Sequence, residues 1–309
     1  MPRLIRIGSR DSSLALWQAK FIESLLNKQG IKTELTLVKS VGDINLTSPL
    51  YEMGVQGIFT KTLDCGLLSN SIDIAVHSLK DVPTQLPKNL KIAAIPKRAN
   101  VKDAIVYQDA KFKVTDEAGI TIATSSLRRK AQWLNRYPNH TIESIRGNIN
   151  TRLEKLNKTP HWNAALFAVA GIDRIELDVP NKMELDWMLP APAQGALAVV
   201  CREDDQEALE TCKTLNHQET AICAGIERSF LRNLKGGCSI PIAALATIEK
   251  DKIHFKGNIL SLDGVRKVEI EMEFELGNYE NAGRLAAEKL LKNGGDKIAL
   301  ELKSLMTEE

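Results

Sequence analysis

Short apolar runs alternate with longer amphipathic stretches in the first third of the chain. Residues 4–7, 34–38 and 72–76 have the length and composition of strands. Between them lie residues 13–29, in which apolar side chains recur at helical spacing, and residues 58–68, a second predicted helix. This order of strand, helix, strand, helix, strand predicts a parallel sheet that is joined by right-handed crossovers.

The pattern restarts after a polar stretch near residue 100. Predicted strands at 103–107, 120–123, 141–145 and 164–169 alternate with amphipathic helices, which indicates a second α/β lobe. A Pro-rich segment then runs into an apolar strand that begins near Ala196. This strand looks like a crossover back to the first lobe, and a chain that crosses twice gives a two-lobed body with a hinge.

The last part of the chain has a different pattern. A predicted helix at 219–234 precedes three strands, at 242–248, 252–260 and 267–276, and a final helix at 279–291. Asp263-Gly264 is a turn signal between the last two strands, so these strands are expected to be antiparallel. The predicted fold class is therefore α/β, with two lobes that contain parallel-rich sheets and a small C-terminal α+β domain. The predicted domains are a discontinuous first lobe, a second lobe and a C-terminal domain, at residues 1–98 with 196–216, 99–195 and 217–309.

Composition narrows the class of protein. The 309 residues are 43% hydrophobic and 26% charged, with a formal net charge of +2, as in ordinary globular proteins. This small charge and an aromatic content of 5% argue against nucleic acid as a partner. No apolar run is long enough to span a bilayer and no signal peptide is visible, so a cytoplasmic protein is expected. Five cysteines without a C-x-x-C pair argue against a zinc site or a disulfide framework, so no metal is predicted.

The segment from His77 to Pro83 is the first candidate for chemistry. It follows the apolar run 72–76, and Pro83 favours a turn over a helix. Lys80 and Asp81 are therefore delivered to the carboxyl end of a strand, the edge at which open α/β sheets bind ligands. A Lys-Asp pair at such a place is more often a solvated surface pair, so this segment alone does not decide the matter.

Three strand-to-helix turns carry hydroxyl or glycine residues together with arginine. They are Gly8-Ser9-Arg10, the run from Thr124 to Arg129, and Arg146-Gly147-Asn148. Helix starts attract anions, and arginine binds carboxylate or phosphate through two parallel hydrogen bonds. A single arginine of this kind is usually a solvent-facing charge. Several at turns of one type predict a cleft for a small polyanion.

Cys238 differs from the other cysteines. It follows Gly236-Gly237 and precedes Ile240-Pro241, so it is expected on an accessible loop. An accessible thiol is a candidate for covalent attachment. On the local sequence alone, an ordinary, partly buried loop cysteine is slightly favoured over an attachment point.

Taken together, these segments resemble the porphobilinogen deaminase (hydroxymethylbilane synthase) family over the whole chain. The matching stretches occur in the order and spacing of that family: Ser9-Arg10, Leu14 to Gln18, His77 to Pro83, Thr124 to Arg129, Arg146-Gly147-Asn148, Thr151-Arg152-Leu153, Ala168 to Gly171, Gln194-Gly195-Ala196 and Gly236-Gly237-Cys238. One departure is Gln56, which stands where many members have a lysine, and Glu52 stands where a basic residue is common.

The resemblance implies two lobes like those of periplasmic binding proteins, and a dipyrromethane cofactor joined by a thioether to Cys238. The implied enzyme is a monomeric transferase that condenses four porphobilinogen molecules, releases ammonia and yields hydroxymethylbilane. Asp81 matches the catalytic aspartate, and Phe59 matches an aromatic residue near the pyrrole rings. The other implied substrate and cofactor contacts are Arg10, Ser12, Ser78, Lys80, Thr124, Ser125, Ser126, Arg128, Arg129, Arg146, Arg152 and Gln194.

A second hypothesis comes from another class of protein. A two-lobed anion-binding or sensor protein without chemistry would explain the arginine-bearing turns, but it gives no reason for Lys80-Asp81 or Gly-Gly-Cys238. A DNA-binding regulator is disfavoured, because neither a helix-turn-helix nor a basic arm is visible.

Overall fold

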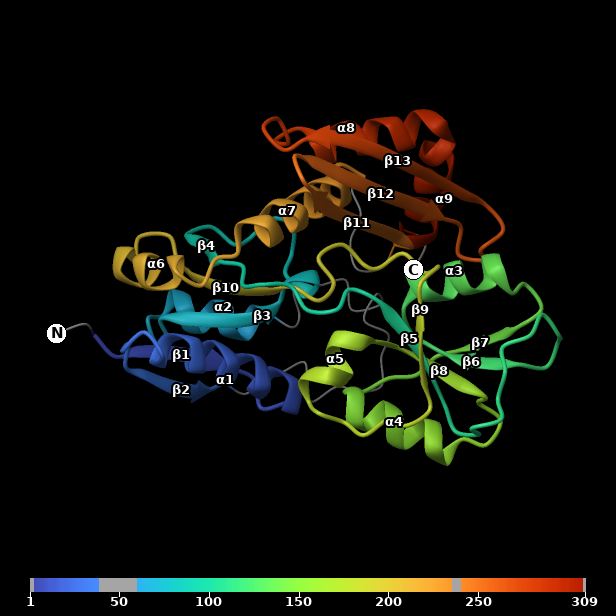
Figure 1. The fold of residues 1–309 in the computed structure, drawn as a ribbon, viewed down its shortest axis with the longest axis horizontal. Coiled ribbons are helices and arrows are strands. Elements are labelled where there is room, and N and C mark those ends of the chain that lie inside the picture. The colour runs from blue at the N-terminus through green and yellow to red at the C-terminus, as the bar shows by residue number, and fades with distance from the viewer. Residues whose placement is uncertain (1–2, 39–59, 235–239, 308–309) are drawn as a thin grey trace. The chain divides into compact units, whose positions relative to one another are not determined.

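The computed structural model describes residues 3–38, 60–234 and 240–307 of the chain. It divides into two compact units, Met1–Ala99 with Gly195–Ile222 and Asn100–Gln194 with Cys223–Glu309 (Figure 1). The first unit is discontinuous because the chain returns to it at Gly195, where the sequence predicted a crossover. The three-domain division of the sequence analysis stays a prediction.

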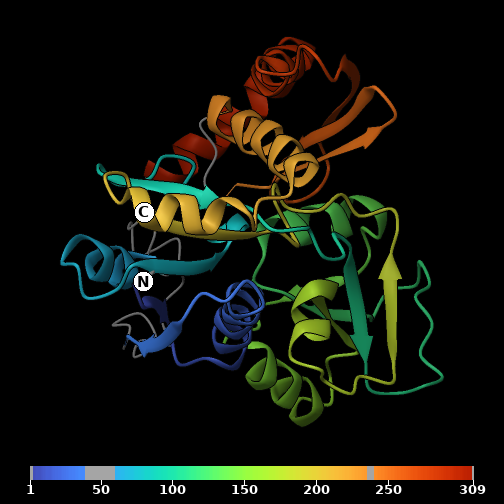
Figure 2. The same cartoon turned by 60° about the vertical axis from the view of Figure 1, so that its left-hand side comes forward.

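The first unit contains a five-stranded mixed sheet. Its spatial order is β2 (Thr33–Leu37), β1 (Ile5–Ser9), β3 (Ile74–Ser78), β10 (Leu197–Arg202) and β4 (Leu90–Ala94). β1 is parallel to both β2 and β3, whereas β10 is antiparallel to β3 and to β4, and Figure 2 shows β10 and β4 side by side. The helices that begin and end in this unit are α1 (Ser13–Asn27), α2 (Lys61–Leu68) and α6 (Gln206–Lys213).

Local signals fix the ends of α1. The Ser12 hydroxyl accepts a hydrogen bond from the Ala15 amide at 3.4 Å, so Ser12 is the N-cap. After the helix, Gly30 has a φ of +78°, as its left-handed stop signal predicts. Because α1 begins at its N-cap Ser12, three residues after β1 ends, Arg10 and Ser12 lie at the carboxyl end of β1.

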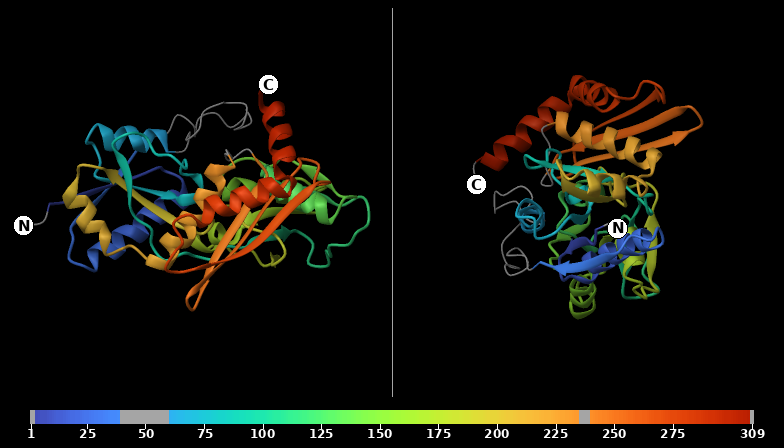
Figure 3. Two further views of the ribbon diagram at one scale, coloured as in Figure 1. Left: turned by 90° about the horizontal axis from the view of Figure 1, so that it is seen from above. Right: turned by 90° about the vertical axis from the view of Figure 1, so that its left-hand side faces the viewer.

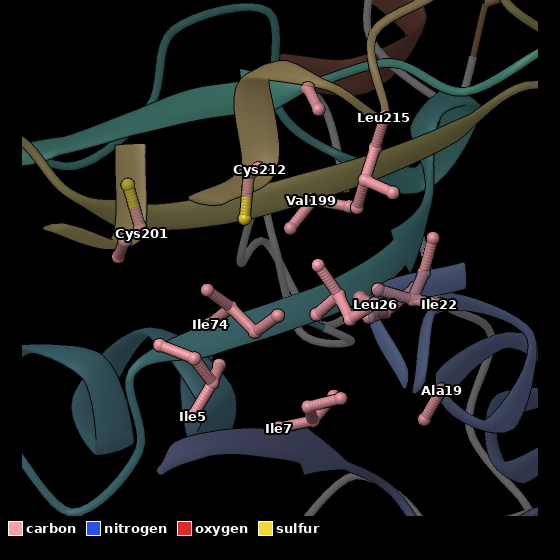
Figure 4. Close-up of a cluster of buried hydrophobic side chains, with 13 residues drawn as sticks. Ile5, Ile7, Ala19, Ile22, Leu26, Ile74, Val199, Cys201, Cys212 and Leu215 are labelled. Carbon is pink, nitrogen blue, oxygen red and sulfur yellow. The ribbon is translucent and has the colours of Figure 1, made fainter. Parts of the chain in front are cut away.

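The core of the first unit lies between the sheet and its helices. Figure 4 shows Ile5 and Ile74 of the sheet and Ile22 of α1 converging with Cys201 of β10 and Cys212 of α6. Burial raises the pKa of the Cys201 thiol to about 11 and that of Cys212 to about 12, so both behave as small apolar side chains.

The second unit begins with another five-stranded mixed sheet. Its order is β7 (Thr141–Glu143), β6 (Thr121–Ala123), β8 (Ala164–Ala168), β5 (Asp103–Tyr107) and β9 (Lys182–Leu185). β6 is parallel to β7 and β8, and β5 is antiparallel to β8 and β9. The helices that follow its parallel strands are α3 (Leu127–Arg136), α4 (Ile149–Lys158) and α5 (Val169–Arg174).

The C-terminal part of the second unit is an antiparallel sheet covered by helices. Strands β11 (Ile242–Glu249), β12 (Lys252–Leu260) and β13 (Lys267–Glu275) pair in sequence order. Helix α8 (Ala282–Leu290) is followed by a kink within Leu291–Gly295 and then by α9 (Asp296–Thr307), and Figure 3 shows α8 along this sheet. Helix α7 (Gln218–Asn233) links the two units along the chain.

The predicted fold class is confirmed, with corrections at the level of single elements. Two lobe sheets and a C-terminal α+β part are present, but β10 and β5 run antiparallel to their neighbours. The sequence analysis missed four elements: β4, β9, α5 and α9. No helix in the described ranges is long and apolar enough to cross a bilayer.

Candidate functional site

A pocket opens at the carboxyl end of β1 and β3 within the first unit. Residues from three segments line it: the β1–α1 turn and α1, the start of α2, and the end of β3 with the turn after it. Its polar lining residues are Arg10, Ser12, Gln18, Thr60, His77, Ser78 and Asp81. Four predicted site residues, Arg10, Ser12, Ser78 and Asp81, are therefore brought together here.

The turn after β3 explains how Asp81 is presented. Residues Leu79–Asp81 form one short 3-10 turn, in which Leu79 is fully buried and its amide donates to the Ala196 carbonyl at 3.0 Å. The Val82 amide closes the turn on the Leu79 carbonyl at 3.2 Å. Because Leu79 anchors the turn, Lys80 is half-buried and Asp81 is exposed at the pocket. The predicted turn at the carboxyl end of the strand is confirmed.

The α1 side of the pocket is fixed by a hydrogen bond across to β3. The buried Gln18 amide donates to the Ser78 hydroxyl at 2.8 Å. Arg10 is half-buried just before the same helix, whose N-terminus adds positive potential. A guanidinium, two serine hydroxyls and a helix start form a surface suited to carboxylates.

His77 is the least expected member of this lining. Its side chain is only 7% exposed, and its Nε2 atom has no hydrogen-bond partner among the described residues. Burial and, to a smaller extent, the charge of Arg10 together lower the pKa of the imidazole to about 4. The ring is therefore neutral near pH 7.

A second group of predicted residues lies at one edge of the sheet in the second unit. Arg128 and Arg129 follow β6 on α3, and both are buried against Asp103 at the start of β5. Arg128 donates to Asp103 at 2.7 Å and Arg129 at 2.8 Å. The Gln194 amide also donates to Asp103, at 3.0 Å. These three predicted site residues therefore share one buried carboxylate.

The remaining predicted residues of this unit lie at the ends of β6 and β7. The Ser125 hydroxyl bonds to the Ile145 carbonyl at 2.6 Å, and the Thr124 hydroxyl accepts from the Ser126 amide at 3.2 Å. Arg146 is half-buried after β7. Arg152 is also half-buried and donates to the Gly147 carbonyl at 2.8 Å. Thr124, Ser125 and Arg146 lie on strand-to-helix connections and Arg152 lies within α4, as the sequence predicted.

Two charged residues at the same edge were missed. Asp103 is completely buried, and only the antiparallel register of β5 against β8 brings it to the carboxyl end of β8. Arg174 on α5 is 7% exposed, and burial lowers the pKa of its guanidinium to about 10. The Ala170-Gly171 turn after the predicted strand was the available signal for Arg174, whereas nothing local marks Asp103.

Some predictions fall outside the described residues. They are Phe59 and Cys238, together with the departures at Glu52 and Gln56. No group of three or more His, Cys, Asp or Glu side chains in the described ranges is placed to hold a metal ion.

Comparison with known proteins identifies the family. The family model described as "Porphobilinogen deaminase, dipyromethane cofactor binding domain" matches residues 5–210. This chain belongs to the porphobilinogen deaminase family. A second model, "Porphobilinogen deaminase, C-terminal domain", matches residues 221–292. The predicted family is therefore confirmed.

Individual relatives of this family cover nearly the full chain. The porphobilinogen deaminase of Desulforamulus reducens is 40% identical over 308 residues, which cover 98% of this chain and 99% of that protein. That of Chlorobium phaeobacteroides is 39% identical over 311 residues, with the same coverage. Among solved structures, the methionine binding protein MetQ aligns with a TM-score of 0.44 and 14% identity, over 70% of this chain and 90% of that one.

Proposed function

We propose that the protein is a hydroxymethylbilane synthase that joins four porphobilinogen molecules head to tail. The observation that carries the proposal is Asp81, presented on an anchored turn at a polar pocket in a chain of the porphobilinogen deaminase family. In each condensation, the C–N bond of an aminomethyl group breaks and ammonia leaves. A C–C bond then forms to the free ring carbon of the growing chain, and that carbon loses its proton.

Asp81 is the proposed catalytic residue. Loss of ammonia leaves a cationic pyrrole unit, and a carboxylate at the pyrrole N–H stabilises that developing charge. The same carboxylate can assist proton transfer at the amine and at the ring carbon. Its exposure at the pocket leaves it accessible to a substrate, and Lys80 beside it adds a positive charge for the substrate's carboxylates.

The other proposed contacts bind carboxylates and place the pyrrole rings. Each porphobilinogen carries an acetate and a propionate, so the growing chain is a polyanion that several arginines would stabilise. In this role we propose Arg10, Arg146 and Arg152 as direct ligands. Arg128, Arg129 and Gln194 already share Asp103, so their contacts to substrate would use their remaining donors. The remaining proposed contacts are Ser12, Phe59, Ser78, Thr124, Ser125 and Ser126.

The described residues fit a dipyrromethane cofactor. Its acidic side chains match the arginine and hydroxyl lining of the pocket and the unpartnered nitrogen of His77. When bound, the group supplies the ring carbon to which the first porphobilinogen is joined. We propose Cys238 as its attachment point, because a thioether there would keep the growing chain on the protein.

The mass of the intact protein tests this proposal. The purified protein should be heavier than its chain by two linked pyrrole units, and Cys238→Ser should remove the excess, whereas Cys65→Ser, at an exposed cysteine of α2, should retain it. An excess that survives Cys238→Ser would refute the attachment point. A wild-type protein without any excess and without turnover would instead favour an anion-binding protein.

Asp81→Asn tests the catalytic role separately. The variant should still take up porphobilinogen but release ammonia at least about 100-fold more slowly, the scale of a lost general acid-base group. Ammonia release and substrate uptake are measured on the same sample. Normal turnover in this variant would remove Asp81 from the proposed mechanism.

We also propose a cytoplasmic monomer. The family resemblance supports the monomer, and free cysteines, three of them buried, suit a reducing compartment. Size-exclusion chromatography with light scattering tests the oligomeric state.

A further inference from the structure

His77 is a buried polar residue whose position does not follow from packing. The three residues before it on β3, Ile74, Ala75 and Val76, are all apolar and buried. An apolar side chain would therefore suit the strand at this position. An imidazole nitrogen that stays unpaired at such a place destabilises the folded protein, so its presence calls for a partner beyond the described residues, and a bound ligand supplies one.

The unpaired nitrogen belongs to the pocket. Four buried side-chain atoms lack a hydrogen-bond partner in the described part of the chain: Arg3 Nε, Asp64 Oδ1, His77 Nε2 and Asn258 Oδ1. Of these four residues, His77 alone lines the pocket that holds Arg10, Ser78 and Asp81.

Another buried histidine shows what a structural role looks like in this protein. His140 is 5% exposed, and its Nδ1 accepts a hydrogen bond from the Trp133 indole at 3.0 Å. Its Nε2 lies 2.7 Å from the Thr115 carbonyl. Both ring nitrogens are thus satisfied within the fold, in contrast to His77.

The charge around His77 selects the class of ligand. The neutral ring carries one N–H, and the nearby Arg10 disfavours further positive charge. A carboxylate is favoured there, because it can accept from the ring while it neutralises the guanidinium. An ammonium group would be repelled by Arg10.

We propose that His77 Nε2–H donates a hydrogen bond to a carboxylate of a pyrrole unit that Arg10 also binds, and so positions that unit beside Asp81. This inference rests on the proposed function and adds a residue to it. The carboxylate can belong to an incoming porphobilinogen or to a ring of the dipyrromethane, and the two sources are distinguished by experiment.

The test uses His77→Leu, which removes both ring nitrogens at similar volume, and His77→Gln, which keeps an N–H donor. Cofactor loading is measured by intact mass, KM and kcat for porphobilinogen are measured on the loaded holoenzyme, and Tm is measured for each protein. With an incoming substrate as the source, His77→Leu should raise KM about tenfold or more, as expected for a lost hydrogen bond to a charged group. Loading should stay normal, Tm should not fall, and His77→Gln should recover part of the KM. With the dipyrromethane as the source, the loaded fraction should fall instead.

His140→Leu is the matched control, since it should lower Tm and leave KM and loading unchanged. The inference is overturned if His77→Leu folds, loads and shows the wild-type KM, or if it lowers Tm without changing KM or loading. Should His77→Leu not fold, His77→Met takes its place, because it also lacks an N–H donor; a wild-type KM with normal loading in that variant would mean a structural role. A wild-type protein that neither loads nor turns over would count against the proposed function itself.

Discussion

At the scale of single residues, one buried carboxylate in the second unit pairs with two neighbouring arginines. Asp103 has no exposed surface and accepts hydrogen bonds from Arg128, Arg129 and Gln194. The arginine-bearing turn could be predicted from the sequence, because hydroxyl residues and arginines stand together after a strand. Asp103 could not, since its place depends on the antiparallel pairing of β5 with β8.

Asp103→Asn should therefore destabilise the protein strongly. The change leaves two buried guanidinium groups without their counter-charge, which costs about 3–5 kcal/mol when one partner of a buried ion pair is removed. Urea unfolding measures the loss. Glu154→Gln is the control, because its pair with Lys158 is exposed to solvent and its loss should change the unfolding free energy little. Equal losses in the two variants would contradict the role of Asp103.

His77 gives a prediction about pH. The pKa of its imidazole is lowered from 6.5 to about 4 in the folded protein, so the unfolded chain binds the extra proton between these values. Stability must then fall as the pH decreases from 6.5 to about 4, by about 3 kcal/mol in total. Urea unfolding at a series of pH values should show this slope in the wild type and a much weaker one in His77→Leu. An unchanged slope in the variant would assign it to other groups.

At the scale of elements, the C-terminal hairpin supports the helix that carries Arg128 and Arg129. The turn between β12 and β13 packs on α3, where the Asn135 amide donates to the Gly264 carbonyl at 2.7 Å. Gly264 has a φ of +76°, and a Cβ there would lie 2.6 Å from the Ala131 carbonyl oxygen and 2.6 Å from the Asn135 nitrogen. The turn itself was predicted from Asp263-Gly264, but its contact with α3 was not.

Gly264→Ala should consequently destabilise the protein more than the replacement of a left-handed glycine by alanine normally does. Gly119→Ala is the matched control, because Gly119 also has a positive φ, +93°, but no atom lies within 4 Å of its Cβ position. The control should lose about 1 kcal/mol from backbone strain, and Gly264→Ala should lose a further 1–3 kcal/mol or so from overpacking. Equal unfolding free energies for Gly264→Ala and Gly119→Ala would mean that the turn at Gly264 can shift without disturbing α3.

Strand direction and the last helix escaped prediction for separate physical reasons. Strand period and apolar content identify β1, β3 and β5, but they carry no information on direction, so the antiparallel orientation of β10 could not be predicted. Two adjacent glycines normally signal the end of a helix, and Gly294, with a φ of +101°, does break the helix between α8 and α9. The end was therefore predicted, but the helix that begins again at Asp296 was not.

At the scale of the whole molecule, an ion network connects distant parts of the first unit. Asp73, next to β3, bonds to Arg6 of β1 at 2.8 Å, and Asp205, the N-cap of α6, bonds to Arg3 at 2.6 Å. Burial works to raise the pKa of each carboxyl, but the hydrogen bonds and charges of the arginines outweigh it and hold both below 3.8.

This network predicts loss of stability in acid. A carboxyl whose pKa is lowered by folding stabilises the protein above its unfolded value of 3.8, and this contribution disappears as the pH falls through the lowered pKa. Tm should therefore drop steeply below about pH 4. Asp73→Asn should lower Tm at neutral pH and make the acid drop shallower, and Asp109→Asn, at an exposed loop residue, should do neither. An acid drop that is the same in Asp73→Asn would place its origin elsewhere.

The position of β10 between β3 and β4 also sets the order in which the polypeptide can fold during translation. The first ninety-odd residues emerge from the ribosome with β3 and β4 complete but with the partner that joins them not yet made. The edges of β3 and β4 that pair with β10 therefore stay without hydrogen-bond partners until Leu197–Arg202 has been synthesised. The nascent chain thus carries its most aggregation-prone stage through the synthesis of an entire second sheet, which makes this interval the one that chaperones would most usefully protect.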